Sequence, residues 1–402
     1  MTIEKYDLVL CGAGPANTSL LPDIIRIGNI RCLILEKSNI LGSGAFKDYK
    51  ITANSLGGVF LEKFNECNHD LSIYMRKTDA WKELSDNRDK AVNLSLVGKY
   101  LEDIYGYIKK NESIDDRISI STNSEVKKII KKENGEFDIT YQKNDETFTI
   151  SSKKVAFNIG GKSKERHNSL GKIKVNSDDV IKGVYDKNIK DKSIKNISIV
   201  GSSHSAVSCL IRIIEQLNFK GPIKILTNKK FRFYYSSPSD AEKDNYLFQK
   251  DDICSLSQRV NRYSGLRYDS HIFAKKIYDG IYENIEIFNT KEASDDSVFN
   301  ILNNSDLVIN CTGYESKLIN MKDQNDKEIE LCMDRFGVVT NSNLNPILKS
   351  GDTLQNFYTF GLGSGIKTGG ECGGEKSFEG KIDGVWVYQH VVPKLIFEEL
   401  TI

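Results

Sequence analysis

The chain has 402 residues with 56 basic and 55 acidic side chains, and its formal net charge is +1. This length exceeds one average domain, so two cores are expected, and the balanced charge excludes a global field that would attract nucleic acid or an anionic membrane. No apolar stretch approaches the length of a membrane span, and the N-terminus enters a strand rather than a signal peptide. A cytoplasmic protein is therefore expected.

The eight cysteines are scattered along the chain, and no two form the Cys-x-x-Cys pair of dithiol redox sites or zinc sites. Most are expected to be small buried side chains, and no metal site is predicted. Cys372 lies in a glycine-rich loop, where it could still meet a cysteine that is distant in the sequence.

The first predicted element is a short apolar strand at residues 7–11, which runs into a glycine-rich turn and a helix. Gly12 permits a tight turn, Gly14 lets the backbone approach a phosphate, and the helix N-terminus offers free N–H groups. The next strand, Cys32–Leu35, ends in Glu36, whose carboxylate can accept ribose hydroxyls. The pattern predicts a dinucleotide-binding unit, and the alternative is an α/β turn without a ligand.

Residues 41–107 read as irregular and then helical, with a helix expected over 97–108. Asn54 and Ser55 are candidates for the flavin side of a site, although polar residues before a Gly-Gly turn are also ordinary turn formers. Short alternating runs from 117 to 157 then predict a small antiparallel meander, which includes 118–120 and a run that starts at Val126. The chain is expected to return to a parallel sheet at Val155.

A second nucleotide-binding unit is predicted from a strand at 196–200, a turn at 201–206 that opens an apolar helix, and a strand at 223–226. Ser203 replaces the middle glycine of this turn, which weakens the motif without removing it. The second strand ends without an acidic residue, and three cations follow at Lys229, Lys230 and Arg232. This favours NADPH over NADH, while an ordinary solvated lysine face is the alternative.

The segment from 231 to 280 combines aromatic residues with Arg259, Arg262, Arg267 and Asp269. It could present an arginine to a substrate carboxylate or reach the cofactor phosphates. A structural insertion with surface ion pairs is the favoured interpretation, and no residue of the segment is assigned a catalytic role.

Residues 306–314 form another buried strand that ends in a small-residue turn, as residues 155–161 do. These two strand ends suggest chain crossings between domains. The first domain would then contain residues 1–160 and 315–402, and the second would contain 161–314. Near the C-terminus, a strand at 357–360 runs into a glycine-rich loop that suits close approach to a ligand, and an amphipathic stretch at 382–400 follows, with Pro393 starting or kinking the last helix.

Two glycine loops, the meander between them and the paired strand ends resemble flavoproteins with two dinucleotide-binding domains. Within these, the chain is most similar to the flavin-dependent N-hydroxylating monooxygenases that act on lysine or ornithine side chains. Gly-Ala-Gly-Pro-Ala-Asn at 12–17 resembles their FAD loop, with Asn17 where the general fingerprint has a third glycine. Leu-Glu-Lys at 35–37 resembles their acid-lysine pair. Residues 306–314 resemble a third motif, with Asn310 and Cys311 in place of Leu and Ala.

The resemblance implies an α/β fold of two Rossmann-like domains, the second inserted in the first. It also implies that NADPH reduces FAD and that a C4a-hydroperoxyflavin then delivers oxygen from O2 to a small amine or related nucleophile. The family usually has a Trp-His pair near the flavin, and residues 38–45 contain neither. Its substrate-binding residues are therefore not carried over, and the substrate and the oligomeric state stay open.

The motifs and the resemblance together predict cofactor-binding residues but no catalytic side chain. His204 is interpreted as a backbone-positioning or pyridine-nucleotide contact rather than a general base. The predicted cofactor-binding residues are Gly12, Gly14, Pro15, Ala16, Asn17, Glu36, Lys37, Asn54, Val126, Gly201, Ser202, Ser203, His204, Ser205, Ala206, Gly363 and Ser364.

Two other functions remain open at this stage. One is an FAD-dependent NAD(P)H oxidoreductase or oxidase that inserts no oxygen. The other is a nucleotide-sensing protein that has lost the second site, for which Ser203 is the only support.

Overall fold

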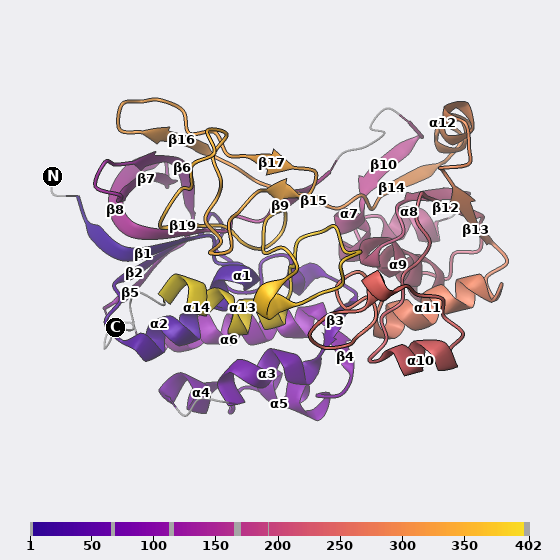
Figure 1. The fold of residues 1–402 in the computed structure, drawn as a ribbon, viewed down its shortest axis with the longest axis horizontal. Coiled ribbons are helices and arrows are strands. Elements are labelled where there is room, and N and C mark those ends of the chain that lie inside the picture. The colour runs from indigo at the N-terminus through magenta and orange to yellow at the C-terminus, as the bar shows by residue number, and fades with distance from the viewer. Residues whose placement is uncertain (1–2, 66–68, 112–115, 165–169, 192, 398–402) are drawn as a thin grey trace.

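The computed structural model describes residues 3–65, 69–111, 116–164, 170–191 and 193–397. Two sheets dominate it, one in each lobe of the molecule (Figure 1). The first sheet has the strand order β16-β6-β7-β8-β1-β2-β5, with β19 paired to β8. Its strands are β1 (Lys5–Cys11), β2 (Cys32–Leu35), β5 (Ile118–Ser121), β6 (Ser124–Lys131), β7 (Phe137–Lys143), β8 (Glu146–Phe157), β16 (Asn320–Asp323) and β19 (Phe357–Tyr358).

The meander is smaller than the sequence suggested. The run at 118–120 was predicted as one of its strands, but β5 pairs in parallel with β2, so that part of the prediction is wrong. Only β6, β7 and β8 pair as antiparallel neighbours. β8 is a single strand of 12 residues whose far edge pairs in parallel with β1, and it therefore joins the meander to the parallel part of the sheet.

The second sheet is entirely parallel and has the order β10-β14-β11-β12-β13. Its strands are β10 (Ile173–Asn176), β11 (Ile197–Val200), β12 (Ile223–Thr227), β13 (Ile285–Asn289) and β14 (Leu307–Asn310). The strand order reverses beside β11, just as it reverses beside β1 in the first sheet. In open α/β sheets, ligands bind outside the carboxyl ends of the strands at such a reversal. Each sheet therefore has one favoured binding edge, where its glycine loop lies.

Helices cover both sheets, and one short antiparallel strand pair, formed by residues 161–163 and 314–316, lies where the chain crosses between the lobes (Figure 1). The helices are α1 (Pro15–Thr18), α2 (Leu21–Ile27), α3 (Gly57–Asn65), α4 (Asp70–Met75), α5 (Asp79–Asp86), α6 (Leu94–Asn111), α7 (Ser177–Lys182), α8 (Asp186–Lys190), α9 (His204–Ile211), α10 (Pro238–Lys243), α11 (Tyr268–Tyr278), α12 (Asp295–Asn303), α13 (Val385–His390) and α14 (Val392–Phe397). Short helical turns are η1 (Phe46–Asp48), η2 (Arg212–Gln216), η3 (Lys250–Asp252) and η4 (Gly370–Cys372). The minor strands are β3 (Thr52–Leu56), β4 (Ala91–Asn93), β9 (Gly161–Ser163), β15 (Tyr314–Ser316), β17 (Met333–Asp334) and β18 (Gly337–Val338).

The predicted helix over 97–108 is present as α6 and extends beyond both expected ends. The amphipathic stretch near the C-terminus forms two helices, and Pro393 lies in the first turn of the second, where a missing N–H costs nothing. Residues 398–400 of that stretch lie outside the described part of the chain. No helix among the described residues is both long and apolar enough to cross a bilayer.

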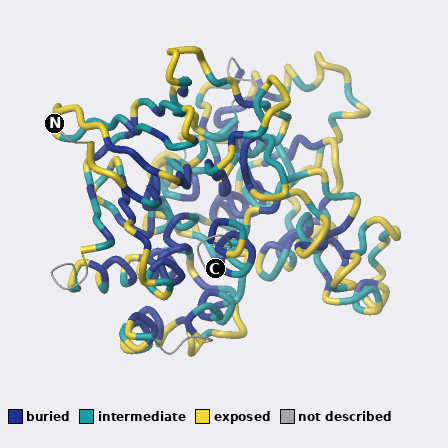
Figure 2. Tube along the Cα trace, turned by 60° about the vertical axis from the view of Figure 1, so that its left-hand side comes forward, coloured by how far each residue is buried: buried dark blue, intermediate teal, exposed yellow. Residues whose placement is uncertain are grey.

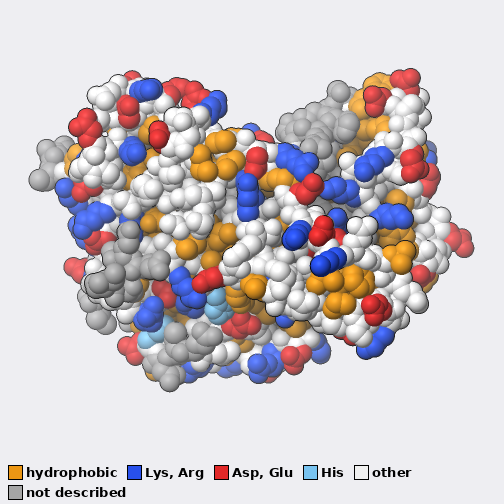
Figure 3. Space-filling model, viewed as in Figure 1, with side chains coloured by type: hydrophobic (Ala, Val, Ile, Leu, Met, Phe, Trp, Pro, Cys, Tyr) orange, Lys and Arg blue, Asp and Glu red, His pale blue; other side chains and the backbone are white. Residues whose placement is uncertain are grey.

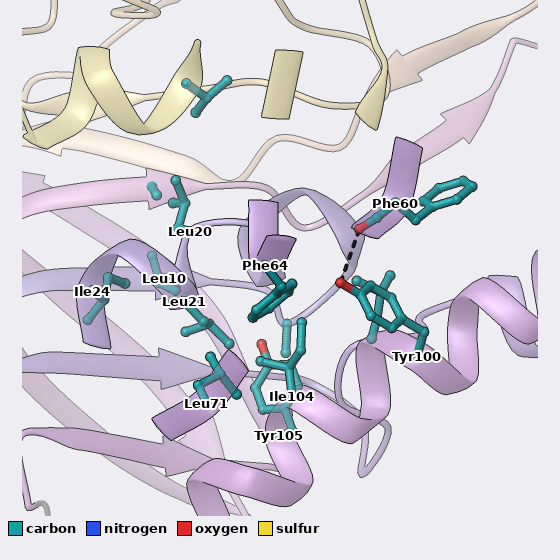
Figure 4. Packing of buried hydrophobic residues seen from close by; sticks show 14 of the residues in the cluster. Leu10, Leu20, Leu21, Ile24, Phe60, Phe64, Leu71, Tyr100, Ile104 and Tyr105 are labelled. Carbon is teal, nitrogen blue, oxygen red and sulfur yellow. Dashed lines mark hydrogen bonds between the residues drawn. The ribbon is translucent and has the colours of Figure 1, made fainter. Parts of the chain in front are cut away.

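The largest apolar core lies between the first sheet and its helices. In Figure 4, Leu10 of β1 and Leu21 of α2 lie above Ile104 and Tyr105 of α6, with Phe64 between them. Tyr100 is buried in the same core, and its hydroxyl donates a hydrogen bond to the carbonyl oxygen of Phe60 at 3.0 Å, so the polar group carries no desolvation penalty. Burial is concentrated along the strands and the helix faces turned toward them (Figure 2). The rigid layer holds the first glycine loop at its edge.

Candidate active site

The first glycine loop is held by backbone contacts that only glycine allows. Gly12 has φ +95, and a Cβ at this position would overlap the carbonyl oxygen of Asn158. Its N–H donates to the oxygen of Leu35 at 2.8 Å, which ties the end of β1 to the end of β2. By contrast, a Cβ on Gly14 would meet no atom within 4 Å. The loop is therefore packed on one side and open on the other, where a phosphate could approach.

The side chain of Asn17 holds this loop through hydrogen bonds on its buried side. Its side chain is fully buried, and Nδ2 donates to the carbonyl oxygens of Cys11 at 3.0 Å and Gly12 at 2.8 Å. Its Oδ1 accepts a hydrogen bond from Nδ2 of Asn158, whose own Oδ1 accepts the N–H of Phe360 at 2.9 Å. The Asn17 side chain therefore positions the loop and presents no surface to a ligand. Asn158 was not predicted as a site residue, because its contacts come from segments far apart in the sequence.

Glu36 lies beside the first loop. One carboxylate oxygen accepts the N–H of Ala13 at 2.8 Å, and the other accepts the N–H and hydroxyl of Ser38, both at 2.9 Å. Lys37 points to the surface, where its ammonium pairs with Glu125 at 2.7 Å. Val126 is buried in β6.

The second glycine loop repeats the geometry of the first. Gly201 has φ +119, its N–H donates to Leu226 at 2.9 Å, and a Cβ would lie 2.5 Å from the carbonyl oxygen of Cys311. Ser203, which replaces the glycine of the motif, is the N-cap residue of α9, and its hydroxyl makes no capping bond. Ser203 is exposed at the helix N-terminus, so serine at this position leaves the turn intact.

The other loop side chains contact protein. The hydroxyl of Ser202 lies 2.7 Å from that of Thr227 on β12. Ser205 is half-buried in the first turn of α9, and Ala206 is fully buried against the second sheet. Small residues at these positions let the helix pack closely on the sheet.

His204 is held as a neutral imidazole. Nε2 lies 3.0 Å from the carbonyl oxygen of Gly265, so Nε2 carries the hydrogen and donates it. Nδ1 is buried and has no partner among the described residues. Burial, helped by the nearby positive charge of Arg267, lowers the pKa of His204 to about 4. A weak base of this kind suits a contact residue better than a general base at neutral pH.

The cations that follow β12 are tied to the C-terminal part of the chain. The ammonium of Lys229 pairs with Glu379 at 3.1 Å, and Arg232 donates to the hydroxyl of Ser377 at 3.0 Å. Arg335 also pairs with Glu379, at 3.0 Å. Basic side chains gather with a few acids over the middle of the face in Figure 3, between the two lobes. The NADPH preference and the solvated-face alternative both stay open, because Lys229 is itself 61% exposed.

The C-terminal glycine segment lies against the first loop. A Cβ on Gly361 would be 3.4 Å from the Cβ of Ala16. Gly44, in the segment that follows β2, also lies against the loop, because a Cβ there would be 3.4 Å from Cδ of Pro15. Gly363 is half-buried, a Cβ there would overlap the backbone nitrogen of Ser316, and its carbonyl oxygen accepts the N–H of Val338 at 3.0 Å. Ser364 is buried. Asn54 lies exposed on β3.

A cleft of about 680 Å³ was not foreseen from the sequence. It separates the end of η1 and the start of α6 from the end of α7, and its lining is mostly polar and basic. The lining residues are Lys47, Asp48, Tyr49, Lys50, Asn93, Ser95, Lys182 and Val184. No local motif marks these positions, because three separate segments form the cleft.

Cys372 forms no disulfide, and every cysteine that the structure describes is a free thiol. Cys67 lies outside the described residues. Cys254 accepts the N–H of Gly374 at 3.1 Å. Burial raises the pKa of the Cys254 thiol, but the hydrogen bonds of Ser257, Arg262 and Gly374 outweigh it and bring the pKa to about 6. The thiol is fully enclosed, which argues against exchange with a soluble disulfide.

No protein-family model matches the chain. A curated relative, CMP-5'-(3-aminopropyl)phosphonate hydroxylase of Streptomyces rubellomurinus, is 26% identical over an alignment of 440 residues, which covers 99% of this chain and 98% of the relative. The ornithine N-hydroxylase of Kutzneria sp. 744 superposes with a TM-score of 0.62 at 13% identity, covering 98% of this chain and 99% of that one. The L-lysine 6-monooxygenase of Pseudomonas syringae gives a TM-score of 0.61 at 11% identity, with the same two coverages.

These likenesses extend over the whole chain, and the glycine loops of the two sheets agree with them. They confirm the predicted α/β fold and its resemblance to the flavin-dependent N-hydroxylating monooxygenases. The chain therefore has the two-domain, Rossmann-like fold of the flavoprotein monooxygenases.

Proposed function

We propose that the protein is an FAD- and NADPH-dependent monooxygenase that hydroxylates the nitrogen of a small amine or a related nucleophilic metabolite. The observation that carries the proposal is the repeated geometry at two glycine loops, one at the carboxyl edge of each sheet. In each loop the first glycine packs on the carbonyl of a neighbouring strand end, and a helix N-terminus follows. Two such loops suit two dinucleotides in one chain. A curated relative of nearly the same length is a hydroxylase.

The residues fit FAD at the first loop. The open side of Gly14 would admit the pyrophosphate, and Glu36 is placed to accept a ribose hydroxyl once a ligand competes for its present donors. We assign residues 1–160 and 315–402 to this domain and 161–314 to the NADPH domain. The division is supported by the strands, because the first sheet takes its strands from 5–157 and 320–358, and the second from 173–310.

When bound, the flavin would supply the chemistry that activates O2 for transfer of one oxygen atom to a nucleophile. The protein residues have simpler tasks. The Asn17, Asn158 and Phe360 contacts hold the first loop and the C-terminal segment together around the site. His204, which stays neutral above its pKa of about 4, would contact the nicotinamide side without adding charge.

The substrate nitrogen must be uncharged to act as a nucleophile, so the site has to favour the free amine. The curated relative is named for a terminal amine carried on a phosphonate, whereas the ornithine and lysine enzymes are named for amino acids. All three names refer to substrates that carry a primary amine. We therefore propose a primary amine as the substrate of this chain.

The absorption spectrum of the purified protein, taken before and after NADPH is added in air, tests the proposal. A flavin spectrum that bleaches with NADPH and recovers with O2 is expected. Amine candidates should then raise NADPH consumption and yield a hydroxylamine in place of hydrogen peroxide. A colourless protein that does not take up added FAD would refute the proposal at its root.

If NADPH is consumed and all O2 leaves as peroxide with every amine, the alternative is favoured: an NAD(P)H oxidoreductase or oxidase that inserts no oxygen. If NADPH binds tightly but no flavin is reduced, the protein is a nucleotide sensor on the same fold. Mass spectrometry of the product after a reaction under ¹⁸O2 separates the first two outcomes directly.

A further inference from the structure

We propose that Arg267 anchors a phosphoryl group, a phosphate or phosphonate carried either by NADPH or by the amine substrate, beside the second glycine loop. The inference rests on the proposed function only for the identity of those two ligands. The anion site itself follows from the position of Arg267, from the charges around it and from the cost of burying an unpaired guanidinium.

Arg267 lies next to the second loop although it is more than 60 residues away in the sequence. It is the N-cap residue of α11, and α11 packs against α9, the helix that the second loop opens (Figure 1). The carbonyl oxygen of Gly265, two residues earlier, lies 3.0 Å from Nε2 of His204. The positive charge of Arg267 acts on the same imidazole. The tertiary fold thus brings a guanidinium to the turn at 201–206.

The guanidinium has no negative partner among the residues that the structure describes. Its NH2 donates to the carbonyl oxygen of Arg262, and its Cζ atom lies 4.3 Å from the ring centre of Tyr234. Two other cations, Arg259 and Arg262, act on it and lower its pKa further. Asp269 follows closely in the sequence but accepts the hydroxyl of Thr52 at 2.9 Å.

The buried carboxylate of Glu375, close to this segment, is also occupied by hydrogen-bond donors. Glu375 accepts the N–H groups of Tyr263 and Ser264 at 2.9 and 2.8 Å, and the hydroxyl of Ser264 at 2.9 Å. Its charge therefore fastens the turn before Arg267 to the C-terminal segment. Arg262 differs from Arg267, because its NH1 donates to Sγ of Cys254 at 3.5 Å, and the pKa of about 6 makes that group a thiolate at neutral pH. Among the described residues, the acceptors of the partly exposed Arg267 are uncharged oxygens.

A partly buried charge without a counterion lowers stability, and such residues are rarely found unless they are paired. Burial is indeed the largest influence on the pKa of Arg267, which it lowers. Stacking on Tyr234 and a hydrogen bond to the hydroxyl of Tyr268 offset part of this cost and fix the guanidinium plane. A fixed guanidinium edge matches two phosphoryl oxygens. The backbone beside it is also unusual, since Tyr268 has φ +46, and strained residues cluster at ligand sites.

Thermal unfolding with and without inorganic pyrophosphate tests the anchor without flavin or turnover. Pyrophosphate is expected to raise the Tm of the wild-type protein and to leave the Tm of Arg267→Gln nearly unchanged, with an apparent affinity at least about tenfold weaker. Without pyrophosphate, Arg267→Gln should melt at or above the wild-type temperature, because it removes an unpaired, partly buried charge. Arg259→Gln is the matched control, since it removes one charge from an exposed position of the same cluster, and it should respond to pyrophosphate as wild type does.

Two ligand titrations then identify the source of the phosphoryl group. If NADPH carries it, Arg267→Gln weakens NADPH binding about tenfold or more and leaves the Michaelis constant for an aminoalkylphosphonate unchanged. If the substrate carries it, the Michaelis constant for the aminoalkylphosphonate rises by that factor, while NADPH affinity and the Michaelis constant for an uncharged aminoalcohol stay near wild type. Either result supports the proposal.

The proposal is overturned if Arg267→Gln keeps the pyrophosphate response, or if it melts well below wild type while both ligands bind normally, because Arg267 would then be a structural residue. Failure of the monooxygenase proposal is recognised separately. A protein that binds no flavin, or inserts no oxygen, can still show the pyrophosphate response and its loss in Arg267→Gln.

Discussion

Replacing Gly12 by alanine should disable the first loop, and the structure allows the size of the effect to be estimated. Two costs add. Alanine at φ +95 is strained, at roughly 1–2 kcal/mol. The new Cβ would also overlap the Asn158 carbonyl oxygen, so the strand ends must separate. Three hydrogen bonds join them, from Asn158 N–H to Cys11, from Asn17 Nδ2 to Ala156 and from Asn158 Nδ2 to Asn17. At about 0.5–1.5 kcal/mol each, the total loss with the strain included is about 2.5–6.5 kcal/mol.

Gly351→Ala is the matched control, because Gly351 has φ +93 and a Cβ there would meet nothing within 4 Å. It should lose only the strain, roughly 1–2 kcal/mol. Urea unfolding followed by circular dichroism gives both free energies of unfolding, and flavin absorbance after desalting gives the FAD retained. Gly12→Ala should lose FAD and Gly351→Ala should keep it. Equal destabilisation of the two variants, with FAD retained in both, would refute the assignment of the first loop.

Three further predictions concern the second loop and the C-terminal segment. His204 has its pKa lowered from 6.5 to about 4, so the unfolded chain binds the extra proton first. The contribution of the neutral His204 side chain to the free energy of unfolding is complete above pH 6.5 and is lost as the pH falls toward 4, by up to about 3 kcal/mol. His204→Gln should flatten that part of a stability-pH profile. An unchanged slope would contradict the buried neutral imidazole. Glu379→Gln should leave the free energy of unfolding nearly unchanged, because its pair with Lys229 is exposed. If Lys229 selects the 2'-phosphate, Lys229→Ala should lower the ratio of NADPH to NADH affinity and Glu379→Gln should not; titration with both nucleotides decides this. Cys372→Ser should retain full NADPH turnover, since Cys372 forms no disulfide, and a loss of turnover without a loss of folding would point to thiol chemistry.

The cofactor assignments of individual residues are predictions for these experiments. For Gly12 and Gly201 the structure gives a physical reason for glycine, because a Cβ would overlap a backbone carbonyl oxygen. For Gly14 it shows open space beside the backbone, where a ligand could approach. For Asn17 it changes the expected role, since a fully buried amide acts by holding the loop. Gly363 is half-buried, and its α-carbon packs on the backbone of Glu315 and Ser316.

The sequence by itself determined the features that depend on near neighbours. A short apolar strand, a turn glycine and a helix start lie within a dozen residues at both loops, so their pattern predicted βαβ units and their order. It could not determine strand partners. An alternating run such as 118–120 looks the same in either sheet direction, and β5 was therefore misplaced in the meander. Pairing direction depends on where the connecting chain returns, which is a property of the whole fold.

Tertiary structure alone decided what surrounds the loops. The contacts of Asn158 with Asn17 and Phe360 join positions separated by 141 and 202 residues. Arg267 lies near the second loop, but the composition of its segment fits a surface insertion as well as a binding site. Whether a charged side chain is exposed or buried, and whether it has a partner of opposite charge, depends on its neighbours in space. Those neighbours are set only when the two sheets and the C-terminal segment have packed together.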